Sequence, residues 1–164
     1  YVPINTENNL LPQIGTRPPL IRENRLYQTD WLLRFYQFSL DEILNPNFTN
    51  LELDIDPKLS WALRNLDQFP VDINTADYPT LIRIPGVGRQ SAMKIIKARK
   101  FGKLREYQVK KFGIAFSRAK YFMVCEDTPF SAGFHYAGRI KQSILNLGSS
   151  KYKNSVPDNQ LSLF

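Results

Sequence analysis

The most informative segment of the sequence is Ile84-Pro85-Gly86-Val87-Gly88, which is followed by Arg89-Gln90-Ser91-Ala92-Met93-Lys94-Ile95-Ile96-Lys97-Ala98-Arg99. Two glycines around an apolar residue predict a tight turn, because glycine permits a positive φ and lets another backbone approach closely. Apolar periodicity predicts a helix on each side, the first over Asp77–Arg83 with Asn74 or Thr75 as its cap. Val87 is expected to point inward. The N–H groups of Gly88 and the next residues then face outward at a helix N-terminus, where they can bind an anion.

This hairpin resembles the helix-hairpin-helix family, whose turn is apolar-Pro-Gly-apolar-Gly, with a small residue (here Ala92) where the two helices cross. The resemblance implies binding to the sugar-phosphate of DNA without reading bases, often with a monovalent cation held by hairpin carbonyls. The DNA-binding residues expected in this copy are Pro85, Gly86, Val87, Gly88, Arg89, Gln90, Ser91 and Lys94. The alternative is a hairpin used only for packing within or between proteins.

A weaker copy of the hairpin follows, in which Phe112-Gly113-Ile114-Ala115 aligns with Pro85-Gly86-Val87-Gly88 and Ala119 aligns with Ala92. Its helices are expected over Lys103–Lys111 and Ser117–Phe122. In the family, paired hairpins form a pseudo-two-fold unit that straddles two phosphate strands. The further DNA-binding residues expected are Gly113, Ile114, Ala115 and Arg118. This copy lacks the proline and the second glycine, so the sequence leaves open whether it binds phosphate.

The charge distribution favours the same partner. The 164-residue chain has a net charge of +7, but residues 83–120 carry twelve Lys or Arg against Glu106 alone. Residues 1–82 carry six basic residues against eleven acidic ones. A basic block around the hairpins predicts a polyanionic partner, nucleic acid before others. A solvated lysine-rich face is the alternative.

Several classes of function are disfavoured by what the sequence lacks. The single cysteine, Cys125, excludes an internal disulfide and a cysteine-built metal site, and it is expected to be buried. The single histidine, His135, leaves little for a catalytic triad. The hairpin also resembles that of endonuclease III-like DNA glycosylases, but Gln90 stands where some of them carry a lysine nucleophile. We therefore expect no enzymatic activity in this chain. No apolar run approaches the roughly 20 residues of a membrane span and no secretory signal opens the chain, which favours a cytoplasmic protein.

A second resemblance covers more of the chain. Residues Arg25–Tyr36, Asp56–Leu63 and the hairpin unit through Phe122 together resemble the C-terminal third of a bacterial family of DNA modification and repair radical SAM proteins. That resemblance implies a preceding catalytic barrel with a [4Fe-4S] cluster and S-adenosylmethionine, and a uracil-DNA-glycosylase-like partner. The barrel's cysteine motif does not occur here, so this chain is expected to hold no cofactor. Because the chain opens at Tyr1 rather than Met, we interpret it as a fragment.

The predicted fold is mainly α, with at most one short β element, expected at Leu51–Asp56. An apolar helix over Arg25–Phe38, expected to be buried on several sides, precedes a short helix capped at Ser39 and a helix over Lys58–Asn65. A short helix ended by Gly148 is expected near the C-terminus. The predicted parts are an extended leader (1–24), a helical connector (25–70), a tandem helix-hairpin-helix domain (71–125), a loop with the short helix (126–148) and a flexible tail (149–164).

The tail ends in Gln160-Leu161-Ser162-Leu163-Phe164, which resembles the pentapeptide by which bacterial polymerases and repair proteins bind the sliding clamp. Two large apolar anchors on a polar tether suit that role. The alternative is a tail that packs on its own domain. For the whole chain, the rival to a non-specific DNA-binding module is a protein-interaction module that organises the barrel and its partner. An RNA-directed enzyme subunit is the third hypothesis.

Overall fold

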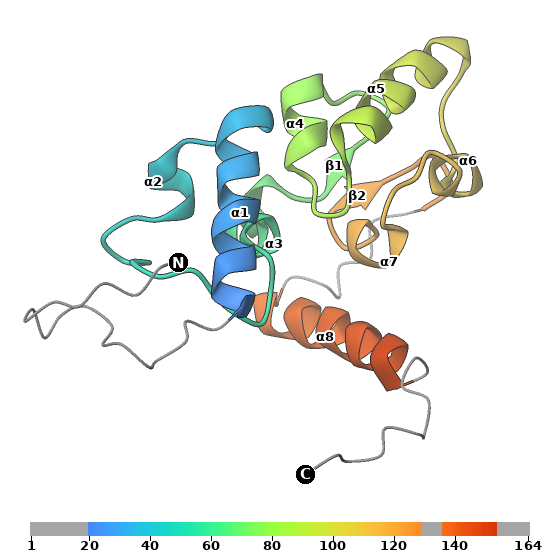
Figure 1. The fold of residues 1–164 in the computed structure, drawn as a ribbon. Coiled ribbons are helices and arrows are strands. Elements are labelled where there is room, and N and C mark those ends of the chain that lie inside the picture. The colour runs from blue at the N-terminus through green and yellow to red at the C-terminus, as the bar shows by residue number, and fades with distance from the viewer. Residues whose placement is uncertain (1–19, 129–135, 154–164) are drawn as a thin grey trace, which may run out of the picture. The chain divides into compact units, whose positions relative to one another are not determined.

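The computed structural model describes residues 20–128 and 136–153 of the chain (Figure 1). Over these residues the fold is mainly helical with one short parallel sheet, as the sequence predicts. The chain divides into two compact units, residues 1–57 and 58–164, and each is described by itself. The described residues contain no helix with the length and hydropathy needed to cross a membrane.

The first unit contains helices α1 (Leu20–Phe35) and α2 (Leu40–Ile43). The predicted cap of α2 is confirmed: the Glu42 carboxylate accepts a hydrogen bond from the Ser39 backbone N–H at 2.8 Å. Helix α1 begins five residues earlier than predicted, so residues 20–24 are helical and not part of an extended leader. The remainder of the predicted leader, residues 1–19, lies outside the described residues.

The expectation that α1 is buried on several sides is wrong. Only Thr29 and Leu32 are buried in this helix, whereas Tyr27 is 62% exposed and Trp31 is 58% exposed. Trp31 instead packs on Phe35 one turn further along the same helix, with ring centroids 4.8 Å apart. The apolar periodicity correctly predicts a helix, but it does not determine whether another element packs against the apolar face of that helix.

The strand expected at Leu51–Asp56 does not form. The segment is irregular, and the Arg25 guanidinium donates two hydrogen bonds to the Leu53 carbonyl, at 2.9 and 3.2 Å. Alternation of apolar and polar residues is a weak signal, because a strand also needs a partner for its backbone groups.

The second unit opens with α3 (Pro57–Arg64) and η1 (Leu66–Gln68). It continues with β1 (Val71–Asp72), α4 (Tyr78–Arg83), α5 (Arg89–Ala98), η2 (Arg99–Phe101), α6 (Glu106–Lys110), α7 (Phe116–Ala119), β2 (Met123–Val124) and α8 (Ala137–Lys153). Helix α3 was assigned to the connector 25–70 on sequence, but the structure places residues 58–70 in the same unit as the hairpins. The reason is its buried face, in which Leu59, Trp61 and Ala62 are at most 2% exposed.

The parallel sheet closes the hairpin region. Strand β1 lies just before the first hairpin unit and β2 just after the second, with Val71 paired to Met123 and Asp72 to Val124 (Figure 1). The Val71 N–H donates to the Phe122 carbonyl at 2.9 Å. The two ends of the segment 71–125 therefore meet, and the only pair of strands among the described residues is used for this closure.

Helix α8 corrects the expected end of the short C-terminal helix. It was predicted to stop at Gly148, but it continues to Lys153, so residues 149–153 of the predicted flexible tail are helical. A glycine inside a helix costs only about 1 kcal/mol relative to alanine. The next proline, which would prevent continuation, is Pro157. The peptide 160–164 lies outside the described residues.

Candidate nucleic-acid interface

The first hairpin joins α4 to α5. Asp77, and neither Asn74 nor Thr75, caps α4: its carboxylate accepts the Thr80 backbone N–H at 3.0 Å. Hydrogen bonds from the Thr80 side chain and backbone hold the pKa of Asp77 below its ordinary value. At the turn Gly86 has a φ of +88°, and Val87 is 1% exposed, as predicted for the residue that locks the two helices together.

The second hairpin repeats this geometry in shorter form. Gly113 has a φ of +79°, Ile114 is 8% exposed and Ala119 is fully buried. The Ala115 N–H donates to the Gly86 carbonyl at 2.9 Å, and the Ser91 hydroxyl donates to the Phe112 carbonyl at 3.0 Å. The two hairpins are therefore in direct contact, which agrees with the tandem arrangement predicted for them.

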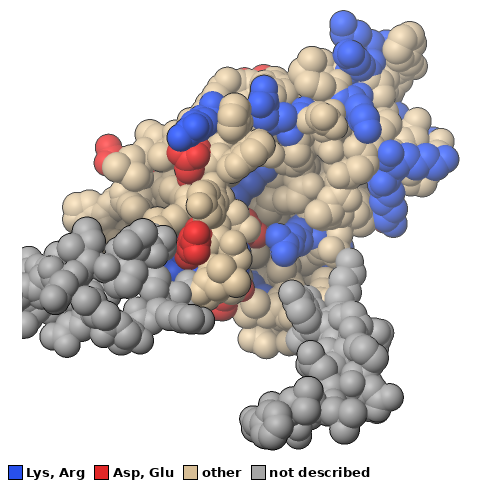
Figure 2. Space-filling view, viewed as in Figure 1, with Lys and Arg blue, Asp and Glu red and all other residues tan. Residues whose placement is uncertain are grey.

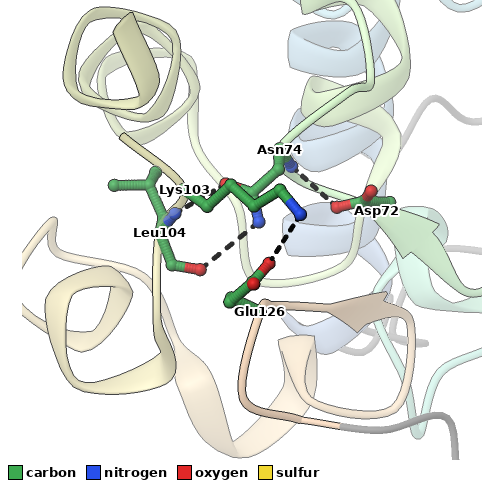
Figure 3. Close-up of polar contacts among 5 residues, drawn as sticks. All are labelled: Asp72, Asn74, Lys103, Leu104 and Glu126. Carbon is green, nitrogen blue, oxygen red and sulfur yellow. Dashed lines mark hydrogen bonds and ion pairs between the residues drawn. The ribbon is translucent and has the colours of Figure 1, made fainter. Parts of the chain in front are cut away.

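The helices of the second copy are shorter than predicted, and a polar cluster accounts for the late start of α6. The Asn74 side chain accepts the Leu104 N–H at 2.7 Å and donates to the Leu104 carbonyl at 3.3 Å (Figure 3). Asp72 accepts the Asn74 N–H at 2.8 Å, and Lys103 forms an ion pair with Glu126 at 3.2 Å (Figure 3). Lys103 and Leu104 are thus tied to the ends of the sheet, and α6 begins only at Glu106. At the other end, α7 stops at Ala119, and the Phe122 carbonyl accepts a hydrogen bond from the Val71 N–H of β1.

Cys125, just after β2, is buried as predicted. Burial raises the pKa of its thiol above the ordinary value, so the side chain behaves as a small apolar group.

Four of the predicted DNA-binding residues do not present their side chains to solvent. The side chains of Pro85, Val87, Ser91 and Ile114 are buried. Gly86 is turned to the second hairpin, because a Cβ built on it would lie 2.6 Å from the Ala115 carbonyl oxygen. A motif defines which residues build a hairpin, and only the fold separates those that form it from those that reach its surface.

The remaining predicted residues do lie at the surface. Gly88 is half-buried, and the exposed residues are Arg89, Gln90, Lys94, Gly113, Ala115 and Arg118. Gly88 is the N-cap of α5, a helix of 10 residues. Within the described residues, the N–H groups of Gly88 and Gln90 donate to no acceptor, so they can serve an external anion.

The basic block forms an exposed surface over these elements. Figure 2 shows Lys and Arg side chains gathered over the part of the surface formed by α5 and α6. In the second copy, Lys110 pairs with Glu106, and Lys103 pairs with Glu126. Lys94 and Lys97 on α5 have no ion pair within the described part of the chain. Lys111 and Lys120 in the second copy likewise form no ion pair among those residues, so exposed positive charge without an ion pair lies at both hairpins.

Sequence reasoning missed Lys58, in the first turn of α3. Its side chain is 8% exposed, and its ammonium donates to the Val87 carbonyl of the first hairpin at 2.7 Å. The sequence signal that could have identified Lys58 is its position in the helix. A lysine in the first turn opposes the helix dipole, so a use elsewhere in the fold is expected.

Comparison with known protein families matches residues 67–111 to the helix-hairpin-helix motif. The match covers the whole first hairpin and α6, and it ends before Gly113. No curated protein and no solved structure matches the chain. The motif is one that binds DNA and is typically non-catalytic, which fits the expectation that this chain carries no enzymatic activity. Residues 67–111 are thus a helix-hairpin-helix motif, and nucleic-acid binding is the general function that this motif supports.

Proposed function

We propose that this chain is a DNA-binding module that holds the sugar-phosphate backbone of duplex DNA, without preference for sequence, through its first hairpin. The observation that carries the proposal is that the N–H groups of Gly88 and Gln90, at the start of α5, donate to no acceptor in the part of the chain that the structure describes. A phosphate oxygen accepts hydrogen bonds from such groups, and the positive end of the helix dipole favours its charge.

Recognition of the DNA backbone, and not of the bases, follows from the N–H groups and exposed cations at the start of α5. Gly88 has no side chain, so a phosphate can approach its N–H closely. Arg89 and Lys94 stand exposed on the first turns of the same helix and supply charge. Base-edge recognition needs side chains inserted into a groove, whereas contacts to phosphate fix a protein on DNA without reading sequence.

A salt titration of DNA affinity tests the proposal. If about four phosphates are neutralised, log K should fall with log salt with a slope of about −3.6. Duplexes of unrelated sequence should bind equally well. Absence of binding at low salt, or a slope near zero, would contradict the proposal and favour a protein-interaction module.

We further propose that the module presents DNA to a radical SAM catalytic domain in a larger repair protein that works with a uracil-DNA-glycosylase-like partner. The resemblance of residues 25–36 and 56–63 supports this context. A gene sequence with no CxxxCxxC motif upstream of this region would contradict it.

Sliding-clamp binding through Gln160–Phe164 belongs to the same proposal. A weak, non-specific DNA binder gains from a second attachment, because tethering gives the two contacts a high effective concentration. The test is a calorimetric titration of clamp against this chain and against a version that ends at Asp158. Equal affinity for both would show that the peptide is not the ligand.

A protein-interaction role for the first unit is the second candidate, and the exposure of Tyr27 and Trp31 on α1 favours it. The two functions separate experimentally. Trp31→Ser should leave DNA affinity unchanged if α1 serves another protein, and a tenfold loss of DNA affinity would instead assign α1 to DNA.

A further inference from the structure

Lys58 is a buried basic residue that DNA contact does not account for. It lies in α3, outside the matched motif 67–111, and its side chain is 8% exposed. Its ammonium reaches the tip of the first hairpin and donates to the Val87 carbonyl at 2.7 Å. A charge-assisted hydrogen bond of this length fixes both groups.

The carbonyl groups of this hairpin do not fit the monovalent cation that the family resemblance implies. The Ile84 carbonyl accepts the Val87 N–H at 3.1 Å, and the Gly86 carbonyl accepts the Ala115 N–H at 2.9 Å. The Val87 carbonyl accepts the Lys58 ammonium. A metal ion placed on the Val87 oxygen would stand beside a like charge, which disfavours it.

The same peptide group connects Lys58 to the phosphate site. The Val87 carbonyl and the Gly88 N–H belong to one planar peptide bond and point in opposite directions. A positive charge on the carbonyl side polarises the peptide and strengthens the N–H as a donor, as in a chain of hydrogen bonds. The N–H strengthened in this way is that of Gly88, at the start of α5, for which the described residues provide no acceptor.

We propose that the Lys58 ammonium takes the place of a monovalent cation at the first hairpin, so that Gly88 binds phosphate without any metal ion. Lys58 acts as a positioning residue, through the Val87–Gly88 peptide. This inference rests on the proposed DNA-binding function, because its readout is DNA affinity.

The experiment measures the affinity of the full chain for a fluorescent duplex in four salts at one ionic strength: sodium, potassium, lithium and tetramethylammonium. The wild-type dissociation constants should agree within about twofold, because the cation is built into the protein. Lys58→Met removes the charge and keeps the side-chain length. It should weaken binding about tenfold in tetramethylammonium, as expected for loss of one charge-assisted contact, and sodium or potassium should restore part of the loss.

Lys97→Met is the matched control, since Lys97 is exposed on α5 and has no ion pair among the described residues. Its smaller loss of affinity should be the same in all four salts. A Lys58 side chain that merely holds the hairpin together would give the same uniform pattern for Lys58→Met, and that result would overturn the proposal.

A wild-type affinity that changes more than fivefold with the identity of the cation would also overturn it, and this arm needs no variant. If thermal unfolding shows that Lys58→Met does not fold, Lys58→Arg is used. Because this variant keeps the positive charge, its dissociation constants for DNA should be the same in all four salts. Absence of DNA binding in every salt would refute the proposed function, and the role of Lys58 with it. Binding with strong cation dependence refutes only the role of Lys58.

Discussion

The two hairpins of this chain share a backbone conformation but differ in what their N–H groups do. Each has a glycine with positive φ, Gly86 at +88° and Gly113 at +79°, followed by a buried apolar residue. In the first hairpin the Gly88 N–H donates to no acceptor among the described residues. In the second, the equivalent N–H of Ala115 donates to the Gly86 carbonyl at 2.9 Å, and the next, of Phe116, donates to the Ile114 carbonyl at 2.8 Å.

The difference indicates that the second copy supports the first. The N–H groups of Ala115 and Phe116 are used inside the protein, whereas that of Ser117, like that of Gln90, donates to no acceptor among the described residues. Helix α7 has only four residues against ten in α5. A short helix provides few aligned peptide dipoles at its N-terminus. The hairpin that lacks the proline and the second glycine is therefore the one whose N-cap N–H, that of Ala115, is engaged within the protein. Four predictions test this comparison, in order of decreasing expected effect.

Alanine at the two positive-φ glycines should separate the hairpins by stability. Gly86→Ala places a Cβ 2.6 Å from the Ala115 carbonyl oxygen, in addition to the unfavourable φ. We expect a loss of about 3–4 kcal/mol in the free energy of unfolding. Gly113→Ala meets nothing closer than the Ser91 hydroxyl at 4.0 Å and should lose about 1–2 kcal/mol from backbone strain alone. Urea denaturation measures both, and equal losses would contradict the close approach at Gly86.

Aspartate at the two helix N-caps should separate the hairpins by DNA binding. Gly88→Asp puts a carboxylate where phosphate is proposed to bind, and we expect a loss of about 2 kcal/mol, near thirtyfold in affinity. Ala115→Asp adds the same charge at the equivalent position, whose N–H is already engaged, and should cost less than threefold by general repulsion. Aspartate is a favoured N-cap, so both variants should fold. Equal losses in an anisotropy titration would show that both hairpins hold phosphate.

Removing the Ser91 hydroxyl should test the contact between the hairpins. Ser91→Ala loses the 3.0 Å hydrogen bond to the Phe112 carbonyl at a buried position. The free energy of unfolding should fall by about 1 kcal/mol, and DNA affinity should change less than twofold. A large loss of affinity without a loss of stability would return Ser91 to the DNA-binding residues.

Neutralising single cations near the two hairpins should produce the smallest effect. Lys94→Ala and Arg89→Ala should each reduce the salt slope of DNA binding by about one, because each removes one phosphate contact. Arg118→Ala, in the second copy, should leave the slope nearly unchanged. Its control is the wild-type titration in the same buffers. A larger change for Arg118 than for Lys94 would place the DNA on the second hairpin.

The sequence alone was enough to predict both hairpins, because their turns depend on local chemistry. Gly86 and Gly113 adopt the positive φ for which glycine is suited, and Val87 and Ala92 occupy the buried positions that their spacing predicts. The basic charge of residues 83–120 could also be read from the sequence, because it depends only on which residues are present. Predictions that relied on hydrophobic periodicity alone were less successful. The strand expected at residues 51–56 has no neighbouring strand to pair with, and the apolar face of α1 has no element that covers it among the described residues.

The tertiary structure decided which groups of the hairpins remain available for binding. Pro85 and Ser91 belong to the motif, but both are buried, and Ser91 donates its hydroxyl to the Phe112 carbonyl of the second copy. Over residues 20–128 and 136–153 the Ala115 N–H has an acceptor and the Gly88 N–H has none, although the two positions align in sequence. Lys58 reaches the hairpin from 29 residues away along the chain. Such pairings depend on contacts between segments distant in sequence, and local propensity carries no information about them.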